Sequence, residues 1–472
     1  MSNDQRHADH REITQTIETI GRGADARRWD EVRNAFAARV VFDYGTPELL
    51  LPDQIVDRWR PLLGAFDSTE HVVSDPVVEW VDADLARVKS HFRSTHRLLQ
   101  AEGGDTWVLT GRYEHELVRT ASGWKVSRMR MVPGESTGNG RLIDGARARA
   151  NLPTPAPASF RVEHIRFESH GTQLVGVLRV PVQATPASRL PAVVVTGSWT
   201  TVKEQMPAAY AERLAAAGFA AFTFDFRGFG ESVPATGDAK PSDLPRYFES
   251  PLRKVEDIHA AVDALSANPL VDFQRIGLLA VCASTGYAAL ESADDARVRS
   301  LVLVAPWLHD PELVRAIYGG ESGVRERMNL GLAAEREYED SRSISYVAAA
   351  SGTDPSAAMG DFEYYLSPAR GGIPQWGNRF ALMSWPGWLT FDPSQAAAAR
   401  VRAPTRFVHS ETGAVPEGVR RFTQRMTAPH DVQWLDGPTQ FDFYDDQRTI
   451  DRAIVLALEH LERTLVRSAA AK

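Results

Sequence analysis

The chain has 472 residues, of which 43% are hydrophobic and 24% charged, with a formal net charge of −8 and a pI near 5.9. This length predicts two or three domains, and the acidic balance argues against a surface for nucleic acid or anionic membrane. The single cysteine excludes an intrachain disulfide framework and a cysteine zinc site. No apolar run approaches the roughly 18 residues of a membrane helix, and the start MSNDQRHADHREI lacks the features of a signal peptide. We therefore expect a cytoplasmic protein with neither a membrane nor a nucleic-acid partner.

The N-terminal part, residues 1–150, has the pattern of helices followed by an antiparallel sheet. Ile13, Ile17 and Ile20 recur at helical spacing. The later stretches VVFDY, VVEWV, DLARVKSHFRSTHRLL, DTWVLTGRYEHELVRT and GWKVSRMRMV are typical of strands. Alternation places Tyr113 and His115 on one face of their strand. This order of elements predicts a cone-shaped α+β barrel domain.

Residues 151–160, NLPTPAPASF, are rich in proline and predict an extended linker. In residues 161–472, the apolar runs LPAVVVTG, AAFTFDF, RIGLLAV, RSLVLVAP and PTRFVHS alternate with helical segments such as MPAAYAERLAAAG and EDIHAAVDALSA. Repeated βα units predict a doubly wound, mostly parallel sheet with its site at the carboxyl ends of the strands. An aromatic- and glycine-rich stretch, about 311–398, interrupts this rhythm and predicts a lid insertion.

The stretch RIGLLAVCASTGYAAL predicts a strand that turns sharply into a helix, with Cys282 at the turn. A nucleophile at such an elbow needs small residues two positions before and after it, and Ala280 and Ser284 meet that need. Ser284 is the alternative nucleophile, and a buried, inert thiol is the alternative without chemistry. The N–H of Ala283 and the loop with Ser198 and Trp199 are candidate oxyanion donors, unless that loop is only a tight turn.

These motifs together resemble the α/β-hydrolase fold. The match comprises VTGSWTTVKEQM, FDFRGFGES, RIGLLAVCAS, RAPTRFVHSETGAVPEG and DGPTQFDFYDD, in that order along most of residues 160–472. The cysteine at the elbow resembles dienelactone hydrolases and related bacterial enzymes. The resemblance implies that Glu411, after the strand RFVHS, is the triad acid, although a plain surface charge is the alternative.

The same resemblance implies a histidine in the final loop, where this chain has Gln440. Glutamine cannot accept a proton at pH 7, so it cannot be the general base, although it can orient a substrate or water. His309 and His409 follow other strands and are candidates to replace the missing base, while His460 lies too far along a helix. A thiol needs less activation than a hydroxyl, particularly at a helix N-terminus.

The lid insertion contributes aromatic residues that either pack its own core or form a pocket for an apolar or ring-containing substrate. The candidates for the pocket are Tyr364, Tyr365, Trp385 and Trp388.

The N-terminal part resembles the SnoaL-like, ketosteroid-isomerase-type cone over roughly residues 9–135, on FDYGT, STEHVVSDPVVEW, GRYEHELVRT and GWKVSRM. That superfamily includes dehydratases, isomerases and cyclases, and also domains without chemistry. The resemblance makes Asp43 with His91 or His115 a candidate acid–base pair for enolisation or water elimination. The alternative is a closed cone used for homodimerisation.

Three functions remain open. The first is a hydrolase or acyl-transfer enzyme that acts through Cys282 on a small ester, lactone or other carbonyl metabolite. The second is a lyase, isomerase or cyclase without an acyl-enzyme, acting on polyketide-like or aromatic metabolites. The third is a non-catalytic protein that binds a metabolite. No nucleotide-binding loop or H-E-x-x-H motif is present, so we expect a small-molecule substrate and neither cofactor nor metal.

Overall fold

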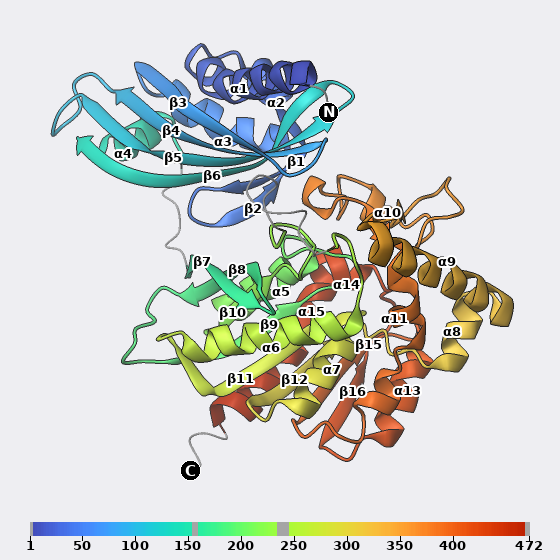
Figure 1. Cartoon of the computed structure of the whole chain (residues 1–472). Coiled ribbons are helices and arrows are strands. Elements are labelled where there is room, and N and C mark those ends of the chain that lie inside the picture. Colours follow the sequence, from blue (N-terminus) through green and yellow to red (C-terminus); the bar gives the residue numbers. More distant parts are fainter. Residues whose placement is uncertain (1–2, 153–158, 234–244, 468–472) are drawn as a thin grey trace. The chain divides into compact units, whose positions relative to one another are not determined.

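The computed structural model describes residues 3–152, 159–233 and 245–467, in two compact units (Figure 1). One unit holds elements α1 to α4, and the other holds β7 to η3 except for part of η1. Most of the expected proline-rich linker lies outside the described residues. No helix in the described ranges is both long and apolar enough to cross a membrane.

The N-terminal unit is a six-stranded sheet with helices against it. Its elements are α1 (Asn3–Asp25), α2 (Trp29–Ala35), β1 (Phe36–Asp43), β2 (Pro47–Leu50), α3 (Pro52–Gly64), β3 (Ser68–Trp80), β4 (Leu85–Arg97), β5 (Thr106–Thr120), β6 (Gly123–Gly138) and α4 (Leu142–Arg149). The strand order is β2-β1-β6-β5-β4-β3, with β1 parallel to β6 and the other pairs antiparallel.

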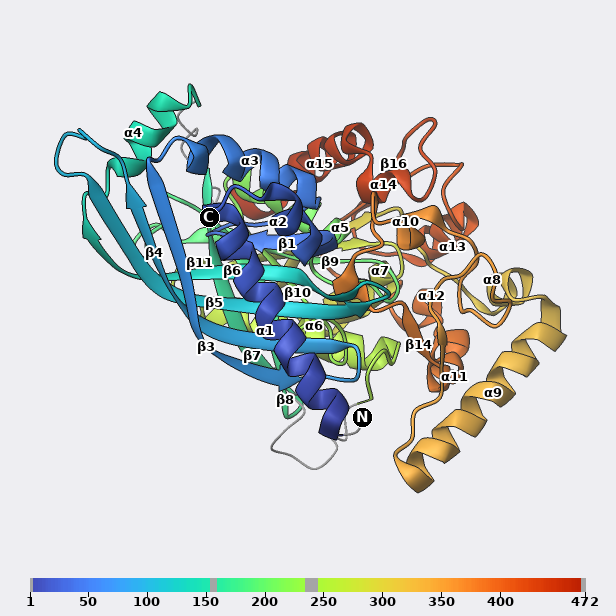
Figure 2. The ribbon, with the colours of Figure 1, turned by 90° about the horizontal axis from the view of Figure 1, so that it is seen from above.

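Helix α1 crosses one face of this sheet (Figure 2). Ile13, Ile17 and Ile20 are buried, as their helical spacing predicts, and join a core with Val88, Leu117 and other strand residues. The strands alternate between buried and exposed positions. On β4, for example, His96 faces inward and His91 outward. The expected α+β architecture is therefore present, and its concave face surrounds a cavity.

The second unit is built on an eight-stranded sheet of order β16-β15-β12-β11-β9-β10-β8-β7. The antiparallel strands β7 (Phe160–Ser169) and β8 (Thr172–Pro181) lead into the parallel strands β9 (Leu190–Thr196), β10 (Ala220–Phe224), β11 (Val271–Val281), β12 (Val298–Val304), β15 (Thr405–His409) and β16 (His430–Trp434). The central strands are apolar and buried towards their carboxyl ends, at residues 276–281 of β11 and 301–304 of β12, because both faces of the sheet are covered (Figure 1). The covering helices are α5 (Met206–Ala216), α6 (Pro251–Ala267), α7 (Ser284–Asp294), α13 (Pro416–Arg425), α14 (Asp442–Asp445) and α15 (Gln447–Leu461), with η3 (Glu462–Arg467) at the end.

Between β12 and β15 the chain leaves the sheet. This insertion contains α8 (Pro311–Ile317), α9 (Gly320–Ser341), β13 (Tyr346–Ala348), α10 (Glu363–Leu366), η1 (Pro374–Trp376), β14 (Arg379–Ala381), η2 (Leu382–Ser384), α11 (Trp385–Thr390) and α12 (Pro393–Ala396). Strands β13 and β14 pair as a short antiparallel ladder. The doubly wound sheet with a helical insertion agrees with the predicted fold class.

Candidate active site

Cys282 lies between the end of β11 and the start of α7, in the left-handed region with φ of +59°. This conformation is costly for a residue with a Cβ atom. The backbone around it is firmly held: the Cys282 N–H donates to the carbonyl of Val304 (3.0 Å), and its own carbonyl accepts from the N–H groups of Thr285 (3.0 Å) and Trp307 (3.2 Å). The neighbours Ala280 and Ser284 are buried, so the close approach of strand and helix requires their small size.

Four groups lie near the Cys282 sulfur and favour its thiolate by hydrogen bonding: the side chains of Ser198, Tyr444 and Gln440, and the backbone N–H of Ala283. Burial nevertheless raises the pKa of Cys282 above its ordinary value, and these hydrogen bonds only partly oppose that rise. At neutral pH the side chain is therefore a thiol rather than a thiolate.

Gln440 is fixed at both ends of its amide. Nε2 donates to the carbonyl of Ala305 (2.8 Å) and to the hydroxyl of Tyr444 (3.2 Å), and Oε1 accepts from the N–H of Ala414 (2.9 Å). Since the Tyr444 oxygen accepts from Gln440, its own proton is directed towards Ser198 or the sulfur. Gln440 therefore orients the Tyr444 hydroxyl.

Ser198 links two tyrosine hydroxyls. Its Oγ lies 3.0 Å from the hydroxyl of Tyr365 and 3.2 Å from that of Tyr444. Tyr444 was not among the sequence candidates. A usable signal was its position four residues after Gln440, which places both side chains on one side of a helical turn.

The loop that carries Ser198 and Trp199 is held from behind by a buried ion pair. Thr200 has a φ of +62°, and its N–H donates to Oε1 of Glu249 (2.8 Å), while Lys254 donates to the same carboxylate. Trp199 packs between Phe380 and Trp388 at ring-centroid distances of 4.8 and 4.9 Å. These contacts therefore hold the loop in place.

A cavity of about 830 Å³ opens beside the cysteine. Among the sequence candidates, its lining includes Cys282, Ala283, Ser198, Trp199, Tyr365, Trp388 and Gln440. Additional lining residues include Trp307, Tyr318, Arg327, Asp354, Asp361, Phe362, Phe441 and Tyr444. No histidine occurs in this lining, within the parts of the chain that the structure describes. The chemistry available at the sulfur is thus that of hydroxyls and amides.

The structure does not bring Glu411 or His309 into this lining. The Glu411 side chain is 60% exposed and pairs with Arg420 on α13. His309 accepts a hydrogen bond at Nδ1 from Nε1 of Trp307 (3.0 Å) and donates from Nε2 to the carbonyl of Trp388 (3.2 Å). Burial lowers the pKa of His309 to about 4, so the ring is neutral and both of its nitrogens are occupied.

His409 does not line this cavity either. Its Nε2 lies 3.0 Å from the carbonyl of Ala414, its buried Nδ1 has no hydrogen-bond partner among the described residues, and burial lowers its pKa to about 4. Of the other predicted pocket residues, Tyr364 packs edge-on against Tyr365, and Trp385 packs against Phe380. Both are buried and support the lining without being part of it.

In the N-terminal unit, the predicted pair of Asp43 and His91 is separated by the fold. Asp43 is buried, accepts from the N–H of Gly45 (3.0 Å) and lies 3.5 Å from Arg130. The His91 side chain is 73% exposed and lies 3.9 Å from Asp75. His115, by contrast, is buried and lines the cavity of this unit.

Two clusters contain enough acidic or imidazole groups to suggest a metal ion. In the first, Lys203 Nζ lies 2.6 Å from both Asp225 and Glu231 and 2.8 Å from Glu204, so the lysine itself supplies the cation. In the second, the exposed His259 meets the buried carboxylates of Glu291 and Asp295, and Arg297 donates to Asp295. Both arrangements are explained by ion pairing.

Comparison with known proteins assigns a family to each of the two units. A model of the alpha/beta hydrolase family matches residues 192–455, and a model of the SnoaL-like domain matches residues 5–130. The chain therefore belongs to the α/β-hydrolase family, as a hydrolase-type enzyme with an N-terminal SnoaL-like domain.

Individual relatives share modest identity. The uncharacterized protein YcjY of Escherichia coli is 26% identical over 305 residues, which cover 62% of this chain and 94% of YcjY. A thiohydrolase of Eupenicillium brefeldianum is 26% identical over 215 residues, which cover 44% of this chain and 64% of that protein. The crystal structure of the α/β hydrolase GrgF from Penicillium sp. sh18 superposes with a TM-score of 0.53 at 22% identity, covering 64% of this chain and 99% of that one. This last likeness concerns the fold.

Proposed function

We propose that the hydrolase domain transfers an acyl group from a thioester of an apolar or ring-containing acid, through a covalent intermediate on Cys282. The observation that carries this proposal is the Cys282 sulfur, which lies at a strained elbow and faces an 830 Å³ cavity without any histidine in its described lining. Among the small carbonyl metabolites expected from the sequence, the proposal selects thioesters.

The described lining of the cavity contains no imidazole, which argues for a thioester over an oxygen ester. An alkoxide is a poor leaving group unless an acid protonates it, whereas a thiolate has a conjugate acid of pKa about 8.5 and leaves without a proton donor. Hydroxyls and amides are the polar groups around this sulfur. They can stabilise charge but do not act as strong acids or bases.

In the proposed reaction, the sulfur attacks the thioester carbonyl while the hydroxyl of Ser198 or Tyr444 accepts the thiol proton and releases its own proton towards the leaving sulfur. The N–H of Ala283 and a donor from the loop at Ser198 and Trp199 stabilise the negative charge on the carbonyl oxygen. The tetrahedral intermediate then expels the substrate's thiolate, which takes up the displaced proton, and leaves the acyl group on Cys282. Water releases the acid in a second step.

This second step is expected to be slow, because no histidine in the described lining can activate water. The acyl-enzyme should therefore accumulate. The name thiohydrolase, borne by a relative that is 26% identical, is consistent with thioester chemistry.

The test uses the hexanoyl thioester of N-acetylcysteamine and ethyl hexanoate as a matched pair. We expect thiol release from the thioester, little turnover of the ester, and intact-protein mass spectra with one added hexanoyl group. Cys282→Ala should abolish the adduct and lower thiol release by at least about 100-fold, and Tyr444→Phe should slow acylation. Thiol release that is unchanged in Cys282→Ala would contradict the proposal, whereas ligand-induced stabilisation of the wild type without turnover would support a non-catalytic binding protein.

A further inference from the structure

Arg327 brings a positive charge into the cavity beside Cys282. It belongs to α9 of the insertion, and no other arginine or lysine occurs among the described residues that line this cavity. Helix α9 packs against α8 and α11 (Figure 2). Gly331 allows this packing, because a Cβ atom there would lie 2.3 Å from the side chain of Pro386 on α11. The position of Arg327 is therefore set by the packing of the insertion.

The guanidinium of Arg327 is held by neutral groups. Nη1 donates to the backbone carbonyls of Tyr318 (3.2 Å) and Gly323 (3.1 Å). Cζ lies 5.4 Å from the ring centroid of Tyr318 and 5.5 Å from that of Trp385. Nε and Nη2 donate to no residue that the structure describes. One edge of the guanidinium is therefore fixed, and the other is available to a ligand.

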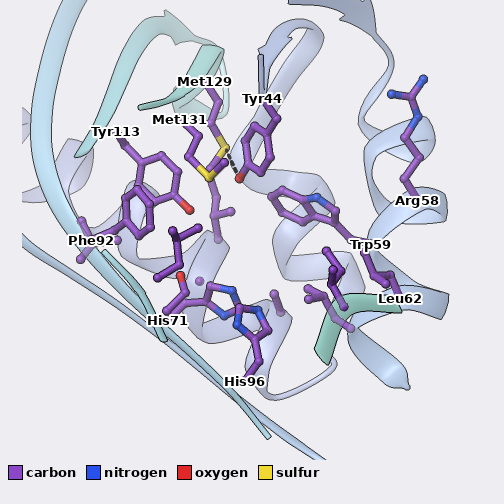
Figure 3. Close-up of a pocket in the computed structure, with 18 of the residues that line it drawn as sticks. Tyr44, Arg58, Trp59, Leu62, His71, Phe92, His96, Tyr113, Met129 and Met131 are labelled. Carbon is purple, nitrogen blue, oxygen red and sulfur yellow. Dashed lines mark hydrogen bonds between the residues drawn. The ribbon is translucent and has the colours of Figure 1, made fainter. Parts of the chain in front are cut away.

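No carboxylate in the described part of the chain forms an ion pair with Arg327. Asp354 and Asp361 also line the cavity, but both are exposed, so solvent and salt screen their charge. By contrast, Arg58 of the N-terminal unit points away from the cavity of that unit (Figure 3) and donates to both oxygens of Glu48. A half-buried cation without a counter-ion is unfavourable. Arg327 therefore indicates an anionic ligand.

The Tyr318 hydroxyl is a second donor next to Arg327. Its oxygen accepts a hydrogen bond from Nε1 of Trp388 (2.7 Å), and an indole N–H can only donate. The proton of Tyr318 is therefore directed to another acceptor, and the described residues supply none. Burial raises the pKa of Tyr318 to about 12, so the hydroxyl keeps this proton at neutral pH. An acceptor in the cavity can thus receive hydrogen bonds from both Tyr318 and Arg327.

These two donors lie close to the acyl-transfer site. Trp388 packs against Trp199, which is on the loop of the candidate oxyanion donors, with 4.9 Å between ring centroids. The charges of Cys282 and Arg327 both act on the Tyr318 hydroxyl, in opposite directions. A ligand held by Arg327 and Tyr318 can therefore place another of its groups at the sulfur.

We propose that this cavity selects thioesters that carry a second, anionic group, a carboxylate or a phosphate, and that Arg327 and Tyr318 bind this group. Nε and Nη2 of a guanidinium form a planar fork that matches two oxygens of either anion, and the Tyr318 hydroxyl donates a third hydrogen bond. The inference rests on the proposed function, because it names the substrate class of the same site. The anion belongs either to the far end of the acyl chain or to the thiol part of the substrate.

The test measures binding by isothermal titration calorimetry, which needs no turnover. The first pair of ligands is adipamic acid and hexanamide, which differ by a carboxylate in place of the terminal methyl group. The second pair is pantetheine 4′-phosphate and pantetheine, measured with a reductant. In at least one pair, wild type should bind the anionic member at least about 10-fold more tightly than the neutral member. The pair that shows this preference identifies which part of the substrate carries the anion.

Arg327→Met should remove the preference and leave the affinity for the neutral members unchanged, and Tyr318→Phe should reduce it. The matched control is Arg325→Met, which changes an exposed arginine of α9 outside the cavity lining and should keep the wild-type preference. Equal affinity for both members of each pair in wild type, or an unchanged preference in Arg327→Met, would overturn the inference. If Arg327→Met does not fold, an unchanged preference in Tyr318→Phe has the same meaning.

This inference and the proposed acyl transfer fail by different results. Preference for the anionic ligands, without thiol release from any thioester, would contradict acyl transfer and support the anion site. Thiol release from thioesters, without preference for an anionic ligand, would contradict the anion site alone.

Discussion

Replacement of Gln440 by histidine should change the ionisation of Cys282. The Gln440 side chain reaches the sulfur, so an imidazole at this position can form an ion pair with a thiolate. The variant loses the hydrogen bonds from Gln440 to Ala305 and from Ala414 to Gln440, each contributing about 1 kcal/mol. We therefore expect a folded but somewhat less stable protein.

The size of the effect follows from the two pKa values. At an ordinary thiol pKa of about 8.5, roughly 3% of a cysteine is thiolate at pH 7, and burial makes the fraction smaller for Cys282. A cysteine beside a histidinium has a pKa of about 3.5–7.5. The pH of half-maximal alkylation should therefore fall by at least about one unit, although the rate at pH 7 rises less, because nucleophilicity falls by about half a log unit per unit of pKa.

The assay is the pH dependence of iodoacetamide alkylation, which is unambiguous because Cys282 is the single cysteine. Gln433→His is the matched control, since Gln433 lies on β16 and donates to Asp431 (2.8 Å). An identical pH profile for wild type and Gln440→His would refute the reasoning that position 440 faces the thiol.

Two further predictions concern stability. Lys254→Met should lower the free energy of unfolding, measured with urea, by about 3–5 kcal/mol, because it leaves the buried Glu249 carboxylate without its cation. The double variant with Glu249→Gln should lose less stability than the sum of the two single variants. Simple additivity would contradict this coupling. In the folded protein the pKa of His96 is about 4 and that of His115 is about 3, below the ordinary value of about 6.5. As the pH drops below 6.5, the unfolded chain therefore takes up protons on these histidines while the folded protein does not. The free energy of unfolding should fall over this range. At pH 5 each of these histidines should have lowered the free energy of unfolding by about 2 kcal/mol. An equal urea midpoint at pH 7 and at pH 5 would contradict the buried, neutral state of these rings.

The sequence predicted the fold class because periodicity and strand order are local signals. The apolar strands and the helical spacing of Ile13, Ile17 and Ile20 depend on short segments, and the structure agrees with them. The placement of Cys282 between a strand and a helix follows from the same kind of signal. The groups around its sulfur do not follow from such a signal, because Ser198 comes directly after β9 and Tyr444 lies in α14, far away in the chain.

Side-chain pairing in the N-terminal unit also depended on information beyond the sequence. Asp43 and His91 are plausible partners by residue type, but β4 alternates, and His91 is on its outer face. Asp25 at the end of α1 pairs with His71 on β3 (2.6 Å). No motif in the sequence indicates this pair, because the last turn of α1 meets β3 only in the folded chain. The alternation of side chains along β4 and the packing of α1 against β3 therefore determine which carboxylate pairs with a histidine.

The left-handed turn at Cys282 has a consequence for how this chain can evolve. The turn is held by backbone hydrogen bonds to Val304, Thr285 and Trp307, and none of these involves the sulfur. The residue at position 282 can therefore change between cysteine, serine and other small side chains while the turn keeps its geometry. A β-branched residue would add strain in this conformation. The reactive atom at the elbow can thus vary among descendants of this protein without a change of fold.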